Sequence, residues 1–377
     1  MKFNVQAKQL HALSASVSRI INSKNALNIL NNFKLTLEED RLTLLASDGE
    51  NFLSGSTTVT EVEGAGTTCI DAKRLVDTLK DLPDVGITVD INTEDNYNVL
   101  ITYPNGEFNF MGFDGADFPL PKQESAATPM RLTIPAANIS RAIDYTVFAV
   151  GNDEYRPQLM GIYWDIKPDK VVFVGSDTRK LVSFADSSIA PGIENAFILP
   201  LKSAMILKNV FTADDDVLVE IEEKGVNFSS ADFTFNSRFL LGKYPEYERV
   251  IPKNSPYKLN IERSTLRNAL RRIGPYCDAA NGLVRIKLHP NSMIMKASES
   301  SYNASAWETA TCEFDGPDDM VLGFSAPYMT EVVNTMPGSN ITIQLSDPSR
   351  PGIFVPAEDE PETSLVMILM PMLVSEF

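Results

Sequence analysis

The stretch MKFNVQAKQLHAL, residues 1–13, decides the fold because it returns twice in altered form. MRLTIPAANISRAI begins at residue 130 and YKLNIERSTLRNAL begins at residue 257, so the copies start 129 and 127 residues apart. Each copy alternates polar and apolar residues, as a half-buried strand does, and then takes the spacing of an amphipathic helix. Similarity at one period indicates an internal repeat. We therefore expect three copies of one structural unit.

Two further patterns recur in the same order inside each copy. LLASDGENFLS, FVGSDTRKLVS and MKASESSYNAS each lead an apolar strand into a turn, with Asp48, Asp177 and Glu299 at matching positions. Each copy also has a second helical stretch after a short strand. Short strands with two helices per copy predict an α+β fold, in which each of three repeated domains packs two helices on antiparallel sheets. The six predicted helices span residues 7–21, 71–82, 135–148, 201–211, 262–274 and 326–335.

Two polar, proline-containing segments separate the copies. PKQESAATP covers residues 121–129 and IPKNSP covers residues 251–256, and both have the composition of linkers. We expect domains at residues 1–124, 125–253 and 254–377. The apolar closing run ILMPMLVSEF, residues 368–377, falls where the third copy needs its last strand, in the place of FNFMGF and FTFNSRF in the earlier copies.

The charge of the chain is unevenly distributed. The net charge is −17, from 33 basic and 50 acidic residues, which argues against simple nucleic-acid binding. The six predicted helices nevertheless hold 12 basic and 6 acidic side chains. Solvated helix faces would explain basic residues on one helix, but five of the six helices carry basic residues, all except residues 326–335. Helices gathered on one side would offer a positive track to a polyanion.

The composition places the chain among intracellular proteins. We expect a cytoplasmic protein with no membrane association, because no secretion signal and no continuous apolar segment of membrane-spanning length occurs. The three cysteines, Cys69, Cys277 and Cys312, are scattered, which predicts neither disulfides nor a zinc site. We expect no cofactor and no metal.

No catalytic constellation stands out, so we expect a protein that is not an enzyme. His11 lies in a predicted helix and His289 precedes a proline, and neither is paired with a nucleophile. Phosphate-binding loops of the GxxxxGK[ST] type are missing. Two other interpretations stay open, namely an acidic hydrolase with paired carboxylates and a repeat scaffold that binds no nucleic acid. Retention on circular but not on linear DNA would exclude both.

Several motifs in order resemble one family, the bacterial sliding clamps, which are the beta subunits of DNA polymerase III. The resemblance covers the whole chain and rests on MKFNV at residue 1, SKNALNIL at 23, DFPLP at 117, RPQLMGI at 156, GSDTRKL at 175, YPEYERVIP at 244 and MPM at 370. It implies three DNA-clamp domains per chain and a head-to-tail dimeric ring around duplex DNA. Such a ring is a DNA polymerase processivity factor, which holds DNA by topology without sequence specificity. Its implied partners are double-stranded DNA, the replicative DNA polymerase, the clamp loader, other clamp-motif proteins and a second copy of the chain.

The resemblance also implies roles for individual residues. The DNA contacts carry over to Lys24, Lys73, Arg141, Lys202 and Arg267. The dimer interface carries over to Phe108, Phe110, Pro275 and Tyr276. A hydrophobic pocket for partner peptides carries over to Leu159, Ser176, Thr178, Lys180, Leu181, Pro245, Arg249, Val250, Ile368, Leu369, Met370, Pro371 and Met372.

The chain departs from the family pattern at two places near this pocket. Many members read Asp-Gly-His-Arg-Leu where residues 177–181 are DTRKL. The usual closing Arg-Leu is replaced by Leu373 and Val374, and Ser375 to Phe377 follow. We expect this extension to trail freely in solvent, the alternative being that Phe377 folds over the pocket as a plug.

Overall fold

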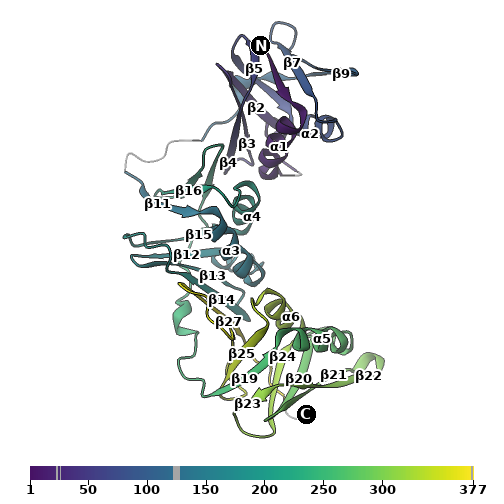
Figure 1. Ribbon diagram of the computed structural model, residues 1–377, viewed down its shortest axis with the longest axis vertical. Helices are drawn as coiled ribbons and strands as arrows, with labels where there is room; N and C mark the ends of the chain where they lie inside the picture. Colours follow the sequence, from purple (N-terminus) through teal and green to yellow (C-terminus); the bar gives the residue numbers. More distant parts are fainter. Residues whose placement is uncertain (23, 26, 122–127, 375–376) are drawn as a thin grey trace. The chain divides into compact units, whose positions relative to one another are not determined.

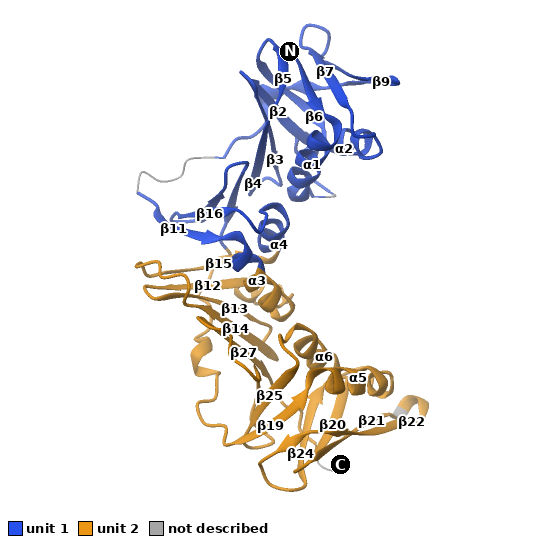
Figure 2. Ribbon diagram, in the orientation of Figure 1, with its two compact units in different colours: residues 1–140, 202–239 blue, residues 141–201, 240–377 orange. Residues whose placement is uncertain are grey.

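The computed structural model describes residues 1–22, 24–25, 27–121, 128–374 and 377 (Figure 1). The domain boundary expected at residues 124 and 125 therefore lies outside the described residues. By their contacts the described residues form two compact units, coloured separately in Figure 2. Unit 1 contains residues 1–140 and 202–239, and unit 2 contains residues 141–201 and 240–377. Within the part of the chain that the structure describes, no helix is both long and apolar enough to cross a membrane.

The α+β fold and all six predicted helices are confirmed. Each helix begins on the residue after a strand ends, as the repeated sequence pattern requires. At one of these junctions Asp71 accepts a hydrogen bond from the Arg74 amide at 2.7 Å, which satisfies a free N–H group at the helix start. The helices are α1 (Ala7–Val17), α2 (Ala72–Lys80), α3 (Ala136–Thr146), α4 (Leu201–Val210), α5 (Arg263–Ile273) and α6 (Ala326–Thr335).

Unit 1 contains one five-stranded and one nine-stranded sheet, both antiparallel. In sheet order, the smaller one consists of β5 (Thr60–Glu63), β1 (Lys2–Gln6), β7 (Gly86–Asn92), β8 (Asn98–Tyr103) and β9 (Gly106–Met111). The larger one consists of β10 (Phe113–Asp114), β6 (Gly66–Asp71), β2 (Asn32–Glu38), β3 (Arg41–Ser47), β4 (Phe52–Thr58), β18 (Phe233–Arg238), β17 (Gly225–Ser229), β16 (Asp216–Ile221) and β11 (Met130–Pro135). Figure 2 shows α1, α2 and α4 on one side of the larger sheet.

Unit 2 repeats this plan with one nine-stranded and one four-stranded sheet. The larger one consists of β15 (Asn195–Pro200), β12 (Gly161–Lys167), β13 (Lys170–Ser176), β14 (Lys180–Asp186), β27 (Thr363–Leu369), β26 (Gly352–Pro356), β25 (Asn340–Leu345), β19 (Tyr257–Glu262) and β23 (Glu313–Phe314). The smaller one consists of β22 (Ala304–Thr311), β21 (Ser292–Glu299), β20 (Leu283–His289) and β24 (Met320–Ser325). Helices α5 and α6 pack against each other in this unit.

Each nine-stranded sheet joins strands from two sequence repeats. In unit 1, β4 of the first repeat pairs antiparallel with β18 of the second, with Gly55 opposite Phe233. In unit 2, β14 of the second repeat pairs antiparallel with β27 of the third. Gly55 allows close packing at the first junction, because a Cβ there would lie 2.7 Å from both Leu13 Cδ1 and Phe233 Cε1. The compact units thus follow the sheets and divide the central repeat between them.

The matching acidic residues of the three repeats each accept a backbone hydrogen bond in a turn. The side chains of Asp48, Asp177 and Glu299 each accept a hydrogen bond from the backbone amide two residues later, at 3.2, 2.8 and 3.0 Å. A carboxylate that binds the backbone in this way fixes a tight turn. The acids therefore hold the turn in each repeat that joins the two strands of the recurring motif.

The closing apolar run only begins as a strand. We expected ILMPMLVSEF to form the last strand of the third repeat, but β27 ends at Leu369 and contains only the first two residues of that run. Met370 still donates its amide to the Arg179 carbonyl at 2.9 Å. Pro371 has no N–H group to continue the ladder, which explains why the strand stops near this point.

Lys202 ties α4 to two other segments of unit 1. Its Nζ donates to the Ile20 carbonyl at 2.6 Å, to Asn22 Oδ1 at 2.7 Å and to Asp48 Oδ2 at 2.7 Å. Burial alone would raise the pKa of the Asp48 carboxyl, but the hydrogen bonds from Lys202 and Asn51 outweigh it and hold that pKa below 3.8. Asp48 is thus ionised in the folded protein and depends on this lysine.

Replacing Lys202 by methionine should lower the free energy of unfolding at pH 7 by about 1–2 kcal/mol, since the Asp48 side chain, 8% exposed, loses its charged partner. Because the pKa of Asp48 is lowered in the folded state, this stabilisation exists above pH 3.8 and shrinks as the pH falls below that value. Denaturant unfolding at pH 7 and pH 3 measures both effects. Lys80→Met, at an exposed position of α2, is the control; an equal loss in both variants would contradict the role given to Lys202.

Candidate functional site

An apolar cavity of about 170 Å³ lies in unit 2, beside the β14–β27 junction. Four segments that are distant in sequence wall it. They are the 3-10 turn η5 (Pro157–Leu159), the turn between β13 and β14, the segment around η6 (Tyr247–Arg249), and the end of β27. The lining residues are Leu159, Ser176, Thr178, Arg179, Lys180, Leu181, Tyr244, Pro245, Tyr247, Val250, Ile368 and Met370.

Strand pairing explains how the cavity forms. Leu181 of β14 lies opposite Ile368 of β27, so the two side chains project side by side from the same face of the sheet. The other face of β14 carries Phe184, which lies against Phe173 and Tyr145. Residues 171–176 of β13 are buried throughout, as its continuous apolar sequence VVFVG suggests for a strand covered on both faces. The cavity therefore stands on a rigid sheet.

Two tyrosines that we did not predict complete the cavity. The rings of Tyr163 and Tyr244 stack with centroids 4.5 Å apart, and Tyr247 donates its hydroxyl to Asp165 Oδ2 at 2.7 Å. Burial raises the pKa of both Tyr244 and Tyr247, so both hydroxyls stay protonated. The buried Tyr244 hydroxyl has no hydrogen-bond partner among the described residues. The two aromatic positions of YPEYERVIP are the sequence signal that would have identified them.

The structure places most of the expected pocket residues on the cavity and leaves four away from its lining. Leu369 is 1% exposed but follows Ile368 on a strand, so its side chain projects from the opposite face. Arg249 extends into solvent and pairs with Glu246 at 2.5 Å. Pro371 and Met372 lie beyond the strand end. The expected residues on the lining are Leu159, Ser176, Thr178, Lys180, Leu181, Pro245, Val250, Ile368 and Met370.

Lys180 is held from the opposite side of the sheet. Its side chain is 6% exposed, and its Nζ pairs with Glu331 of α6 and lies 4.5 Å from the centroid of the Tyr328 ring. A buried ammonium needs such partners, because desolvation without them is costly. The Lys180 charge is therefore satisfied inside the protein, and the cavity presents mainly apolar surface.

Met372 and Phe377, which follow the cavity wall in sequence, lie against the smaller sheet of unit 2. The Met372 amide donates to the Gly323 carbonyl of β24 at 2.8 Å. The Phe377 ring lies 5.9 Å from Lys287 Nζ and 5.8 Å from Lys296 Nζ, measured to its centroid. Phe377 thus contacts β20 and β21, whereas we expected a free tail and considered a plug over the pocket as the alternative. Ser375 and Glu376 lie outside the described residues.

The residues expected to contact DNA differ in their exposure and in whether their charges already have partners within the protein. Lys24 and Lys73 are exposed, and Arg267 is half-buried. Lys202 makes the three hydrogen bonds described above. Arg141 lies 3.4 Å from the fully buried Asp186 and 3.5 Å from Glu360, so its guanidinium already has two carboxylate partners.

The expected interface residues occupy two edges. Phe108 and Phe110 lie on β9, the edge strand of the smaller sheet of unit 1, but Phe110 is only 6% exposed and packs into that unit. Phe108 is half-buried and stacks on Tyr103 at 5.7 Å. Pro275 and Tyr276 are exposed in the 3-10 turn η7 (Gly274–Tyr276), which contacts the edge strand β22.

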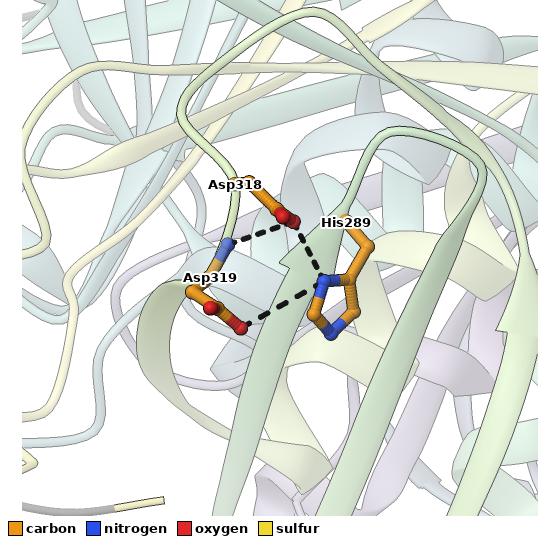
Figure 3. A group of neighbouring side chains, drawn as sticks. All are labelled: His289, Asp318 and Asp319. Atoms are coloured by element: carbon orange, nitrogen blue, oxygen red, sulfur yellow. Dashed lines mark hydrogen bonds and ion pairs between the residues drawn. The ribbon is translucent and has the colours of Figure 1, made fainter.

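One group of side chains has the atoms that a cation could bind. His289 Nδ1 lies 2.7 Å from Asp318 Oδ1 and 3.8 Å from Asp319 Oδ1 (Figure 3). Lys287 Nζ, however, lies 2.6 Å from Asp319 Oδ1 and already supplies a positive charge there. We interpret the group as a surface ion-pair cluster.

Comparison with known proteins matches the chain along nearly its whole length. Three consecutive domains match the DNA polymerase III beta subunit, as its N-terminal domain (residues 1–122), central domain (133–246) and C-terminal domain (248–372). The beta sliding clamp of Bacillus subtilis (strain 168) is 24% identical over 383 residues, covering 99% of each chain. That of Synechocystis sp. is 27% identical over 389 residues, covering 97% of this chain and 98% of the relative. The crystal structure of the Pseudomonas aeruginosa sliding clamp bound to griselimycin superposes with a TM-score of 0.92 at 24% identity, covering 99% of this chain and 100% of that one.

Proposed function

The chain belongs to the DNA polymerase III beta subunit family, the bacterial sliding clamps, and from this premise we propose how it assembles and which surfaces bind its partners. It is a DNA polymerase processivity factor, which acts with DNA and a polymerase. We place it in the cytoplasm, where bacterial DNA is replicated. We keep the three domains 1–124, 125–253 and 254–377 as part of this proposal.

The unpaired sheet edges support a head-to-tail dimer. Within each unit a strand of one repeat pairs with a strand of the next, as β4–β18 and β14–β27. In the first repeat, β9 is the strand equivalent to β18 and β27. In the third repeat, β22 is the strand equivalent to β4 and β14. Both β9 and β22 are edge strands of their sheets. If β9 of one chain pairs with β22 of another, the junction between chains has the same strand pairing as the junctions within a chain. Two such junctions would close a ring of two chains.

The cavity fits a short peptide. An apolar cavity near 150 Å³ accommodates a group of benzene size, so this one, at about 170 Å³, has room for a single large apolar side chain. Clamp-motif segments of the replicative polymerase, the clamp loader and other partners are the occupants we propose. The observation that carries this proposal is the apolar lining built on the β14–β27 junction.

We propose that the protein is not catalytic. An acidic hydrolase would need paired carboxylates of differing pKa in a cleft. No carboxylate lines the apolar cavity described above. A protein that encircles DNA and binds partners through this cavity needs no reacting group.

Removing the chain from Met370 onward should reduce binding of a clamp-motif peptide from the replicative polymerase by about 10-fold or more, because Met370 is lost from the cavity lining while Ile368 remains. Deleting only residues 375–377 should leave affinity unchanged, since Phe377 contacts β20 and β21 instead of the cavity. Fluorescence anisotropy gives both affinities, and sedimentation confirms that the assembly is intact. Full binding by an intact protein without residues 370–377 would exclude this cavity as the peptide site.

Replacing Phe108 and Tyr276 together by glutamate should convert dimers into monomers, because charges would be buried where β9 meets β22. Phe110 is not a suitable target, since its burial means that a charge there would unfold the domain. Phe113→Glu is the matched control, because this aromatic is 57% exposed on β10, outside the proposed interface. Sedimentation velocity reports the mass. A double variant that stays dimeric contradicts the arrangement.

Neutralising Lys24, Lys73 and Arg267 to glutamine should reduce the slope of log affinity for DNA against log salt by roughly one for each phosphate that the variant no longer neutralises. Lys202 and Arg141 are left out because their charges are engaged within the protein. Replacing the exposed Lys243, Lys253 and Lys258 by glutamine removes the same charge from outside the helices. Titration on a short duplex at several salt concentrations compares the two. Equal slopes would show that Lys24, Lys73 and Arg267 do not bind phosphates.

A further inference from the structure

Thr178, at the rim of the cavity, adopts a backbone conformation that its side chain disfavours. Its φ is +78°, in the left-handed region, where a branched Cβ crowds the backbone. Seven other residues besides glycine have positive φ in the described chain, and none of them is β-branched. A residue in such a conformation persists when its surroundings hold it there, and such residues cluster at functional sites.

The same turn occurs in the first repeat with glycine at this position. Gly49 has a φ of +100° and corresponds to Thr178. Its amide donates to Ser47 Oγ at 3.0 Å, and Ser47 Oγ donates to the Asn51 carbonyl at 2.7 Å. Glycine adopts this conformation without a steric penalty. The backbone of the turn thus does not require a side chain.

Around Thr178 the hydrogen bonds are the same as those around Gly49. Its amide donates to Ser176 Oγ at 3.2 Å, and Ser176 Oγ donates to the Lys180 carbonyl at 2.9 Å. Asp177 Oδ1 accepts from the amides of Arg179 and Lys180, both at 2.8 Å. These bonds hold the turn and force Thr178 into the left-handed region. The two turns therefore share these hydrogen bonds, although their residues differ at three positions, Gly49, Glu50 and Asn51 against Thr178, Arg179 and Lys180.

The two positions differ in what surrounds them. Thr178 lines the apolar cavity together with Leu181 and Met370. Both Thr178 and Gly49 are exposed, but at Gly49 a Cβ would meet only Leu30 Cδ1, at 3.6 Å. A strained side chain is thus found in the copy of the turn that borders the cavity, and glycine is found in the copy where a side chain would have little to touch.

We propose that Thr178 is a specificity-determining residue of the pocket, whose methyl and hydroxyl groups contact the bound peptide and whose conformational strain is retained for that contact. This inference rests on the proposed peptide-binding function. The Thr178 side chain would select among peptides by narrowing the rim of the cavity. Stability and binding should then respond to its removal in opposite directions.

The test compares Thr178→Gly and Thr178→Ala in the full-length protein. Thr178→Gly should raise the midpoint of thermal unfolding by about 1–3 °C, because it relieves the strain, and should weaken binding of the clamp-motif peptide by about 3- to 10-fold. Thr178→Ala keeps part of the strain but has neither the hydroxyl nor the γ-methyl group, so its affinity should fall to a similar extent with a smaller rise of the midpoint. Anisotropy titration and thermal unfolding provide the two readouts.

Gly49→Thr is the matched control for the turn itself. It should lower the unfolding midpoint and leave peptide affinity unchanged. If Thr178→Gly binds the peptide as tightly as the parent, or loses both stability and affinity, Thr178 serves the turn and the inference is wrong. If the parent protein itself fails to bind the peptide, the proposed pocket fails and this inference fails with it. The affinity of the parent therefore separates the two failures.

Discussion

Antiparallel pairing between strands of different repeats is the interaction on which the rest of this structure depends. It builds both nine-stranded sheets, through β4–β18 in one unit and β14–β27 in the other. It also creates the pocket, because Leu181 and Ile368 become neighbours only when β14 and β27 pair. Main-chain hydrogen bonds fix the register of such a junction, so side chains from distant parts of the sequence are positioned as precisely as neighbours on one strand.

Charge is distributed unevenly along the chain. The chain is acidic overall, yet basic side chains gather on its helices, which suits a protein that has to stay near DNA without holding it tightly. Some of these side chains have structural duties as well. Lys202 joins three segments of one unit, and Arg141 pairs with Asp186, whose side chain is fully buried. A count of basic residues therefore overestimates the charge that is available to a phosphate.

Sequence reasoning succeeded where a local pattern repeats. The strand-to-helix change near residues 6, 135 and 262 predicted three of the six helices closely, because each copy supports the reading of the others. It was less successful where tertiary contacts determine which side chains line the pocket. Leu369 was expected in the pocket, although alternation along the strand turns it away from Ile368. The tyrosines Tyr244 and Tyr247 were missed although both stand in YPEYERVIP, because their contacts with Tyr163 and Asp165 of β12 form only in the folded chain. The contact of Phe377 with Lys287 and Lys296 also has no local signal in the sequence.

The two free edges have a consequence for the newly made chain. Before the proposed dimer forms, each chain exposes β9 and β22 as edge strands with unpaired backbone groups, which are templates for any compatible strand. Two unlike edges on one molecule can grow into an open filament as readily as they can close into a ring, unless closure is faster than growth. Closure joins ends that are already linked and does not depend on concentration, whereas growth does. A low concentration of new chains therefore favours the proposed ring, and a high concentration favours open assemblies.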